Sequence, residues 1–243
     1  MNTRETMRET WERSFKEQIA DRAYNTAPVE ALARSVSYYL RDRGDAESLH
    51  AAELGCGAGP NLVWLADRDL RVSGIDISDT ALELCRRTLA AAGHEPESLV
   101  EGSVTEVPWE DASLDVAVES CVFQHLARAD REAAFREVDR LVKPGGLFVG
   151  HMLERRHSVF ERRAAEQLPD DPGTLRLEDG SANYHLTNMG LSHFFSADEL
   201  RDLLPGWSVV DPCLSQYELP ASEAAKRGYD RYLQSMYIVY AVK

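Results

Sequence analysis

The sequence predicts an α/β fold in which a doubly wound, seven-stranded sheet carries helices on both faces. Short apolar segments alternate with helix-like segments between residues 49 and 153. The first apolar segment ends in a glycine-rich turn, and an acidic residue closes the second. The chain has 243 residues, which is long enough to bury one such domain with additions at its ends.

Two helices are expected before the sheet, over residues 2–22 and 28–42. Pro28 suits the first turn of the second helix, and Gly44 follows its end. Apolar residues recur at helical spacing between these two positions. We therefore assign residues 1–48 to an N-terminal helical cap.

Residues 49–153 are predicted to form the core of the sheet. Strands are expected over 49–56, 71–78, 98–103, 114–120 and 146–153, and helices over 60–67, 79–92 and 128–142. Because strands alternate with helices, consecutive strands should run parallel.

The pattern changes after the fifth strand. Residues 154–195 are rich in charge, Gly, Pro and Asn and show little periodicity, which predicts a lid over the substrate or a disordered insertion. Residues 196–243 return to the core sheet, with a helix over 197–204 and strands over 207–219 and 236–243. We expect these two strands to form an antiparallel pair at one edge of the sheet.

The main motif is the segment 53–60, ELGCGAGP, at the end of the first strand. Its glycines allow a tight turn and let a ligand approach the backbone closely. Asp76 ends the second strand, 21 residues after Gly55, where a carboxylate can accept hydrogen bonds from both hydroxyls of a ribose. The alternative is a turn that only packs a helix on a strand, with Asp76 as a solvated residue.

The spacing of the loop indicates which nucleoside would bind. It is G-x-G-x-G, with Pro60 where a dinucleotide loop has its third glycine. Glu53, just before the loop, would repel a pyrophosphate and favour the ammonium of a bound amino acid. S-adenosylmethionine has that ammonium, a sulfonium and no phosphate. The sequence also lacks a Tyr-x-x-x-Lys pair for hydride chemistry.

Residues 53–59, Asp76, GSVTEVPW (102–109), LDVAVESCVFQHL (114–126) and LVKPGGLF (141–148) resemble the successive motifs of class I S-adenosylmethionine-dependent methyltransferases. The resemblance implies a Rossmann-like fold. It covers residues 49–150 well and 194–243 loosely. One departure is Ser103, since the family often has an aspartate there that accepts from the adenine amino group.

In that family the loop glycines contact the methionine part of the cofactor, the acid binds the ribose, and the segment ending strand four lies near the sulfonium. The residues matching Ser103 and Val104 border the adenine. An arginine of the cap could hold the cofactor carboxylate. The cofactor-binding residues so expected are Glu53, Gly55, Cys56, Gly57, Gly59, Asp76, Ile77, Ser103, Val104, Glu119 and Ser120, with Tyr24 and Arg34 from the cap.

Methyl transfer depends mainly on alignment, because the sulfonium is already activated. A base is needed only for a protonated acceptor, and histidine suits that role. His125, after strand four, is our first choice and His151, on strand five, is the second. Each histidine could instead serve only in packing. No histidine spacing indicates a metal site. Trp11 and Phe15, four apart on the first helix, are interpreted as core residues.

These features predict methyl transfer from S-adenosylmethionine to an oxygen or nitrogen of a small metabolite, leaving S-adenosylhomocysteine. Transfer to a protein or RNA is one alternative. A cofactor-binding protein without catalytic activity is another, and a nucleotide-dependent oxidoreductase is a distant third.

The bulk composition limits partners and location. A net charge of −14 disfavours nucleic acid, because the chain would repel a phosphate backbone. The four cysteines include no C-x-x-C pair, which is typical of free thiols in a reducing compartment. There is no apolar signal segment and no apolar run of about 18 residues. We therefore expect a cytoplasmic protein that contacts no membrane. A homodimer is a possible assembly.

Overall fold

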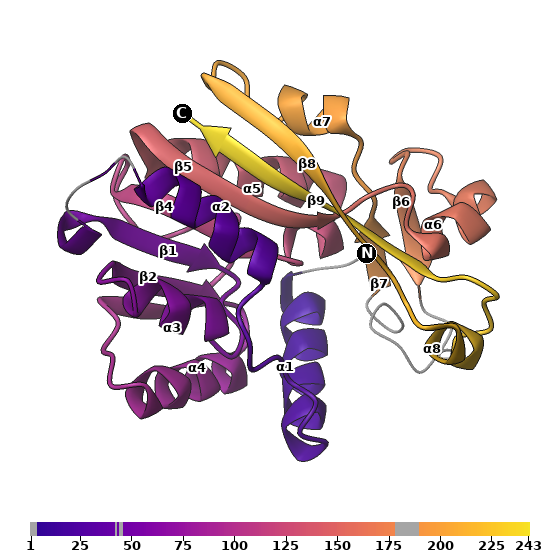
Figure 1. Cartoon of the computed structure of the whole chain (residues 1–243), viewed down its shortest axis with the longest axis horizontal. Coiled ribbons are helices and arrows are strands. Elements are labelled where there is room, and N and C mark those ends of the chain that lie inside the picture. Colours follow the sequence, from indigo (N-terminus) through magenta and orange to yellow (C-terminus); the bar gives the residue numbers. More distant parts are fainter. Residues whose placement is uncertain (1–3, 42, 44–45, 178–189) are drawn as a thin grey trace.

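The computed structural model describes residues 4–41, 43, 46–177 and 190–243. Its main sheet contains β1 (His50–Leu54), β2 (Arg71–Asp76), β3 (Ser98–Glu101), β4 (Leu114–Ser120), β5 (Val142–Leu153), β8 (Val209–Glu218) and β9 (Leu233–Val242). The strand order is β3-β2-β1-β4-β5-β9-β8 (Figure 1). The strands from β1 to β5 are parallel, and β9 runs antiparallel to both β5 and β8. The doubly wound sheet and its antiparallel edge pair are confirmed.

Helices cover both faces of this sheet. On one face lie α2 (Glu30–Leu40), α3 (Pro60–Ala66) and α4 (Asp79–Ala91), and on the other lie α5 (Arg128–Leu141) and α7 (Ala197–Asp202). Successive side chains of β4 point to opposite faces of the sheet. Val116 and Val118 pack with the first group of helices, and Ala117 packs with the second. Buried parallel strands of this kind need apolar residues on both faces.

The layer under α5 is built from aromatic rings. Phe135 of α5 lies 5.2 Å from Phe123 and 6.0 Å from Phe148, centroid to centroid, with edge-to-face geometry. Phe195 completes the group at 6.3 Å from Phe135. All four side chains are fully buried. Phe123 belongs to the short helix η2 (Phe123–His125), so this packing also fixes the loop that follows β4.

The expected N-terminal cap has two parts with different roles. The helix α1 (Arg4–Ala20) lies beyond the carboxyl ends of β1 and β2, outside the layered core (Figure 1). In contrast, α2 packs its Leu32 and Val36 against the sheet, in the same apolar cluster as Leu147. Only α1 therefore covers the edge of the sheet where a ligand would bind. A 3-10 turn, η1 (Ala46–Ser48), leads into β1.

The segment expected to be an irregular lid contains regular structure. Its described part forms α6 (Ser158–Arg163), η3 (Ala164–Glu166), β6 (Thr174–Leu177) and β7 (Gly190–His193), and β6 pairs antiparallel with β7. Phe160 and Phe194 pack there in a small separate core. A further helix, α8 (Ala221–Lys226), lies between β8 and β9 and was not predicted. These elements are four to six residues long, which is too short for periodicity to reveal them.

Among the described residues, no helix has the length and apolar character needed to cross a membrane.

The aromatic cluster under α5 provides a stability prediction. Phe135→Ala should lower the free energy of unfolding by about 3–5 kcal/mol, because it leaves a cavity among three rings. Urea denaturation followed by circular dichroism measures this change. Tyr217→Ala on the edge strand, where the side chain is 60% exposed, should change it by less than about 0.5 kcal/mol. Equal losses in the two variants would contradict a core role for Phe135.

Candidate active site

The turn after β1 requires glycine at two positions. Gly55 has φ of +84°, and a Cβ there would approach Val122 Cγ2 within 2.3 Å. Gly59 has φ of +83°, and a Cβ there would lie 2.6 Å from Cys85 Sγ. Larger residues would therefore meet both backbone strain and a clash. The turn packs tightly against the loop after β4 on one side and against α4 on the other.

Asp76 is buried at the end of β2, beside this turn. Its Oδ2 accepts from Gly57 N at 2.9 Å, and its Oδ1 accepts from Ser78 N at 3.0 Å. Burial raises the pKa of Asp76 to about 6, although these backbone donors oppose the shift. Each oxygen keeps a lone pair for a further donor, which is the arrangement that binding two ribose hydroxyls requires.

Glu53 lies at the end of β1 and is almost completely buried. Its Oε1 accepts from Asn61 Nδ2 at 2.7 Å, whereas its Oε2 is buried and has no hydrogen-bond partner among the described residues. Burial raises the pKa of Glu53 well above its ordinary value. Asn61 also accepts from Val29 N at 2.9 Å and so joins the turn to the start of α2. A buried carboxylate oxygen without a donor indicates a site for a cationic or hydrogen-bonding ligand.

Glu119 holds the loop that follows β4. Its carboxylate accepts from Val122 N at 3.1 Å, Phe123 N at 3.3 Å and His151 N at 3.0 Å. It is fully buried, and burial raises its pKa to about 7 against the effect of these donors. The chain turns sharply above it, where Cys121 has φ of +60°. Non-glycine residues in this conformation concentrate at functional sites.

The helix α1 forms the roof of the site. Glu12 accepts from Ser78 Oγ at 2.7 Å and from Thr80 N at 3.2 Å, and Thr80 Oγ1 also donates to it. Ser78 is the N-cap of α4, so Glu12 adds its charge to the favourable end of that helix. Burial opposes the charge of Glu12, but the hydrogen bonds outweigh it and lower its pKa to about 2. Arg8 forms a second tether with Glu101 at the end of β3.

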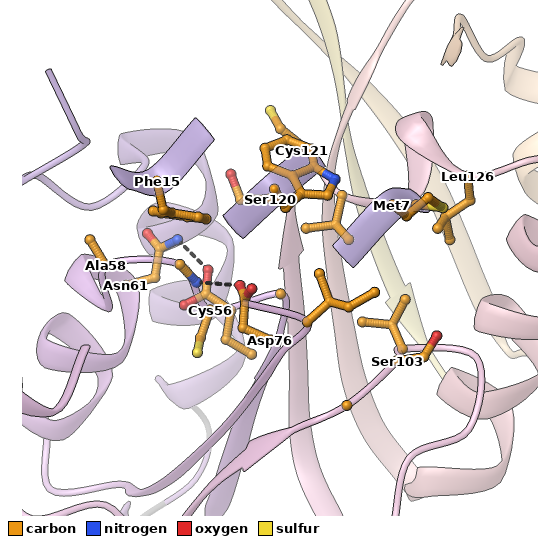
Figure 2. Close-up of a pocket in the computed structure, with 18 of the residues that line it drawn as sticks. Met7, Phe15, Cys56, Ala58, Asn61, Asp76, Ser103, Ser120, Cys121 and Leu126 are labelled. Carbon is orange, nitrogen blue, oxygen red and sulfur yellow. Dashed lines mark hydrogen bonds between the residues drawn. The ribbon is translucent and has the colours of Figure 1, made fainter. Parts of the chain in front are cut away.

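These elements line a pocket of about 240 Å³. Figure 2 shows Met7 and Phe15 facing Cys56 and Asp76 across it. Of the expected cofactor-binding residues, nine line the pocket: Glu53, Gly55, Cys56, Gly57, Asp76, Ile77, Ser103, Val104 and Ser120. Gly59 and Glu119 lie behind its wall and support it.

The structure does not bring Tyr24 and Arg34 to the pocket. Arg34 is exposed and pairs with Glu30 at 2.7 Å within α2. Tyr24 is half-buried in the link between α1 and α2, and its neighbour Asn25 lines the pocket instead. The described lining contains carboxylates but no lysine or arginine.

The two candidate histidines differ in position. His125 is buried behind the pocket, with Nδ1 3.0 Å from the carbonyl oxygen of Leu191 and its ring 5.6 Å from that of Trp11. His151 is half-buried, and its Nδ1 lies 3.4 Å from Ser120 Oγ and 3.6 Å from Cys121 Sγ, both on residues that line the pocket. Burial lowers the pKa of each imidazole to about 4. Both rings are therefore neutral at pH 7.

Several lining residues escaped the sequence analysis. Trp11 and Phe15, interpreted as core residues, line the pocket together with Met7 and Gln18 of the same helix. Three of these four side chains are apolar or aromatic, and on an isolated helix they give the same periodicity for a roof as for a core face. Asn61 directly follows the motif 53–60 and Cys121 lies within the motif 114–126, and that proximity was the available signal.

Comparison with known proteins bears on the identity of this pocket. The Methyltransferase domain family matches residues 52–150, which include every strand-end carboxylate described above. This chain contains a class I methyltransferase domain. The cofactor of the domain is S-adenosylmethionine.

Curated relatives of this chain differ in their stated substrates. A protein of Encephalitozoon cuniculi named as a methyltransferase is 29% identical over 208 residues, covering 81% of this chain and 90% of that protein. A fatty-acid O-methyltransferase of Mycolicibacterium smegmatis is 32% identical over 133 residues, covering 54% of this chain and 46% of that protein. The chain spans only 34–44% of the length of three other curated relatives.

Solved structures share the fold of this chain. A methyltransferase of Methanosarcina mazei superposes with a TM-score of 0.65 at 21% identity, covering 86% of this chain and 96% of that one. A second solved structure is the 1,6-didemethyltoxoflavin-N1-methyltransferase of Burkholderia thailandensis with bound 1,6-didemethyltoxoflavin and S-adenosylhomocysteine. It superposes with a TM-score of 0.59 at 15% identity, covering 100% of this chain and 91% of that one.

The residues of this pocket fit S-adenosylmethionine. The unpartnered Oε2 of Glu53 can accept from its ammonium, and the free lone pairs of Asp76 can accept from its ribose. Acidic side chains without a basic partner in the lining also suit a ligand with two cationic groups.

Asp76→Ala should weaken S-adenosylhomocysteine binding about 30- to 1000-fold, because two charge-assisted hydrogen bonds are lost. Calorimetry gives the dissociation constant. Asp79→Ala, an exposed acid three residues further on, is the matched control and should change it little. An unchanged constant for Asp76→Ala would place the ribose elsewhere.

The raised pKa of Asp76 predicts that ligand binding depends on pH. Asp76 has a pKa of about 6 in the empty protein, and donors from the ribose would stabilise its ionised form. Binding near pH 6 should therefore release protons, and affinity should fall as the pH is lowered through 6. Calorimetry in buffers of different ionisation enthalpy measures the release. Asp76→Asn should reduce it, and an unaltered release would assign it to another group.

The roof contact provides a further prediction. Glu12→Gln should loosen α1, because the neutral amide loses the charge-assisted hydrogen bonds to Ser78 and Thr80. Amide hydrogen exchange over residues 4–20 should speed up relative to the wild type. Glu17→Gln, an exposed acid on the same helix, should leave exchange unchanged. Equal exchange in all three proteins would show that Glu12 does not hold the roof.

Proposed function

We propose that this protein transfers a methyl group from S-adenosylmethionine to an oxygen or nitrogen of a small metabolite. The observation that carries the proposal is the roof. Phe15 of α1 lies over Gly57, and Trp11 and Phe15 line the same pocket as Asp76, so α1 covers part of an otherwise open face. A partly covered pocket suits a small acceptor better than a polypeptide or an RNA.

The character of the walls supports a neutral acceptor with an apolar body. Trp11 and Val122 contribute apolar surface, and no lysine or arginine among the described lining residues could clamp a phosphate or carboxylate. The relatives named for fatty-acid O-methylation and for demethylmenaquinone methylation are consistent with such acceptors. The solved relative named for N1 methylation is consistent with a nitrogen acceptor.

His151 is the better placed of the two candidate bases. It is neutral at pH 7, and its ring adjoins Ser120 and Cys121 at the end of β4, where the resemblance puts the sulfonium. An acceptor hydroxyl held there would give its proton to the imidazole as the new oxygen–carbon bond forms. When bound, the cofactor supplies an activated methyl group and leaves as the thioether. The thiol of Cys121 stays protonated, because burial raises its pKa to about 12.

A labelling experiment separates the proposal from its alternatives. The protein is incubated with methyl-labelled S-adenosylmethionine and a cell extract divided by size into metabolites, RNA and protein. We expect label in the metabolite fraction. Label confined to RNA or protein would contradict the proposal. If S-adenosylhomocysteine binds but none is produced with any fraction, the protein is a cofactor-binding protein without catalysis.

With an acceptor identified, His151→Ala should lower the rate about 10²- to 10⁴-fold while S-adenosylhomocysteine affinity stays nearly unchanged. A base with a pKa of about 4 is deprotonated above pH 5, so the wild-type rate should not fall between pH 8 and 6 through this group. His125→Gln tests our first choice from the sequence. If His125→Gln loses the rate and His151→Ala keeps it, the base assignment to His151 is wrong.

A further inference from the structure

The adenine end of the pocket lacks the acid that this family often places there. Met7, Ser103 and Leu126 lie toward one end of the pocket (Figure 2), and the resemblance puts the adenine beside Ser103. The Ser103 hydroxyl is 2.8 Å from Thr105 Oγ1 and accepts from Thr105 N at 3.2 Å. This local turn occupies much of its hydrogen-bonding capacity. Recognition of the adenine amino group therefore needs another acceptor.

Asp130 provides a further carboxylate in the lining of this pocket. It lies in the first turn of α5, is half-buried and lines the same pocket as Ser103 and Thr105. Among the described residues it has no hydrogen-bond or ion-pair partner. The other pocket carboxylates, Glu53 and Asp76, lie at the ends of β1 and β2.

The packing of α5 explains why Asp130 faces this loop. Further along the helix, Glu137 accepts from Val107 N at 2.7 Å, and Arg140 donates to the carbonyl oxygen of Val107 at 2.8 Å. These contacts fix the loop 102–109 against one face of α5. Asp130 precedes Glu137 by seven residues, which is two helical turns, so it lies on nearly the same face about 10.5 Å along the axis.

We propose that Asp130 accepts a hydrogen bond from the adenine amino group of S-adenosylmethionine and so selects adenine over other purines. The carboxylate reaches the base from α5 rather than from the loop after β3, and it takes the role of the acid missing at Ser103. A site that hydrogen-bonds a ligand group discriminates against an analogue that lacks it, because the site is then left unpaired. The inference extends the cofactor assignment to a residue outside the recognised motifs.

The test compares S-adenosylhomocysteine with the analogue whose purine carries hydrogen in place of the 6-amino group. Calorimetry gives both dissociation constants, and their ratio measures recognition of that group alone. The wild type should prefer S-adenosylhomocysteine by about tenfold or more. Asp130→Ala should bring the ratio to within about twofold of one. Asp130→Asn, which keeps the shape without the charge, should give an intermediate ratio.

Two control variants separate this role from others. Ser103→Ala should keep the wild-type ratio, as should Glu132→Gln, whose side chain pairs with Arg128 on the same helix and does not line the pocket. If Asp130→Ala and Asp130→Asn weaken the binding of both ligands equally, the carboxylate only stabilises the N-terminus of α5, and the proposal is overturned. Loss of the preference in Ser103→Ala instead would assign recognition to the hydroxyl. Failure of the wild type to bind either ligand would overturn the cofactor assignment and this proposal together.

Discussion

Three buried carboxylates at one edge of the sheet determine how the rest of the site is built. Glu53, Asp76 and Glu119 end β1, β2 and β4, which are neighbours in the sheet, and each is less than 10% exposed. Burial raises the pKa of all three, and their hydrogen-bond donors are backbone N–H groups and one amide side chain. Carboxylates that are easier to protonate in the folded state lower the free energy of unfolding as the pH rises through their pKa values. A cationic ligand at this edge offsets that loss.

Each carboxylate also fixes one wall of the pocket. Asp76 holds the backbone of Gly57, and Glu53 reaches the start of α2 through Asn61. Glu119 orders the turn at Cys121 and ties it to β5 through the backbone of His151. The same groups therefore shape the cavity and supply its charge. The glycines then let the walls approach one another, since a side chain at Gly55 would collide with Val122.

The sequence predicts the elements whose physical signal is local. Apolar strands ending in glycine or acid located β1, β2 and β4. The glycine loop, the acid after the second strand and the family resemblance together predicted nine residues of the pocket wall. The contacts of single side chains depend on tertiary packing instead. Arg34 has the charge to hold a carboxylate, but its position on α2 directs it to Glu30 and solvent. Trp11 and Phe15 have the spacing of core residues, and only the position of α1 beyond the sheet makes them a roof. The elements of the expected lid are too short for any period to appear.

The roof also constrains how a ligand reaches the carboxylates. Asp76 and Glu53 are buried in the pocket that α1 lines, so a shift of this helix would widen the way to both. The sheet and its flanking helices are held by two large apolar clusters, whereas from α1 only Met7 packs against them among the described residues. The remaining tethers are few, namely Glu12 on the start of α4, Arg8 on Glu101 and the ring of Trp11 against that of His125. Polar contacts at a partly exposed surface contribute little stability, so α1 is the element that opens at least cost. The charge of Glu12 also opposes ionisation of Asp76, so the contact that closes the roof disfavours the charged form that the ribose needs. Closure is therefore favoured most once a ligand has stabilised that charge.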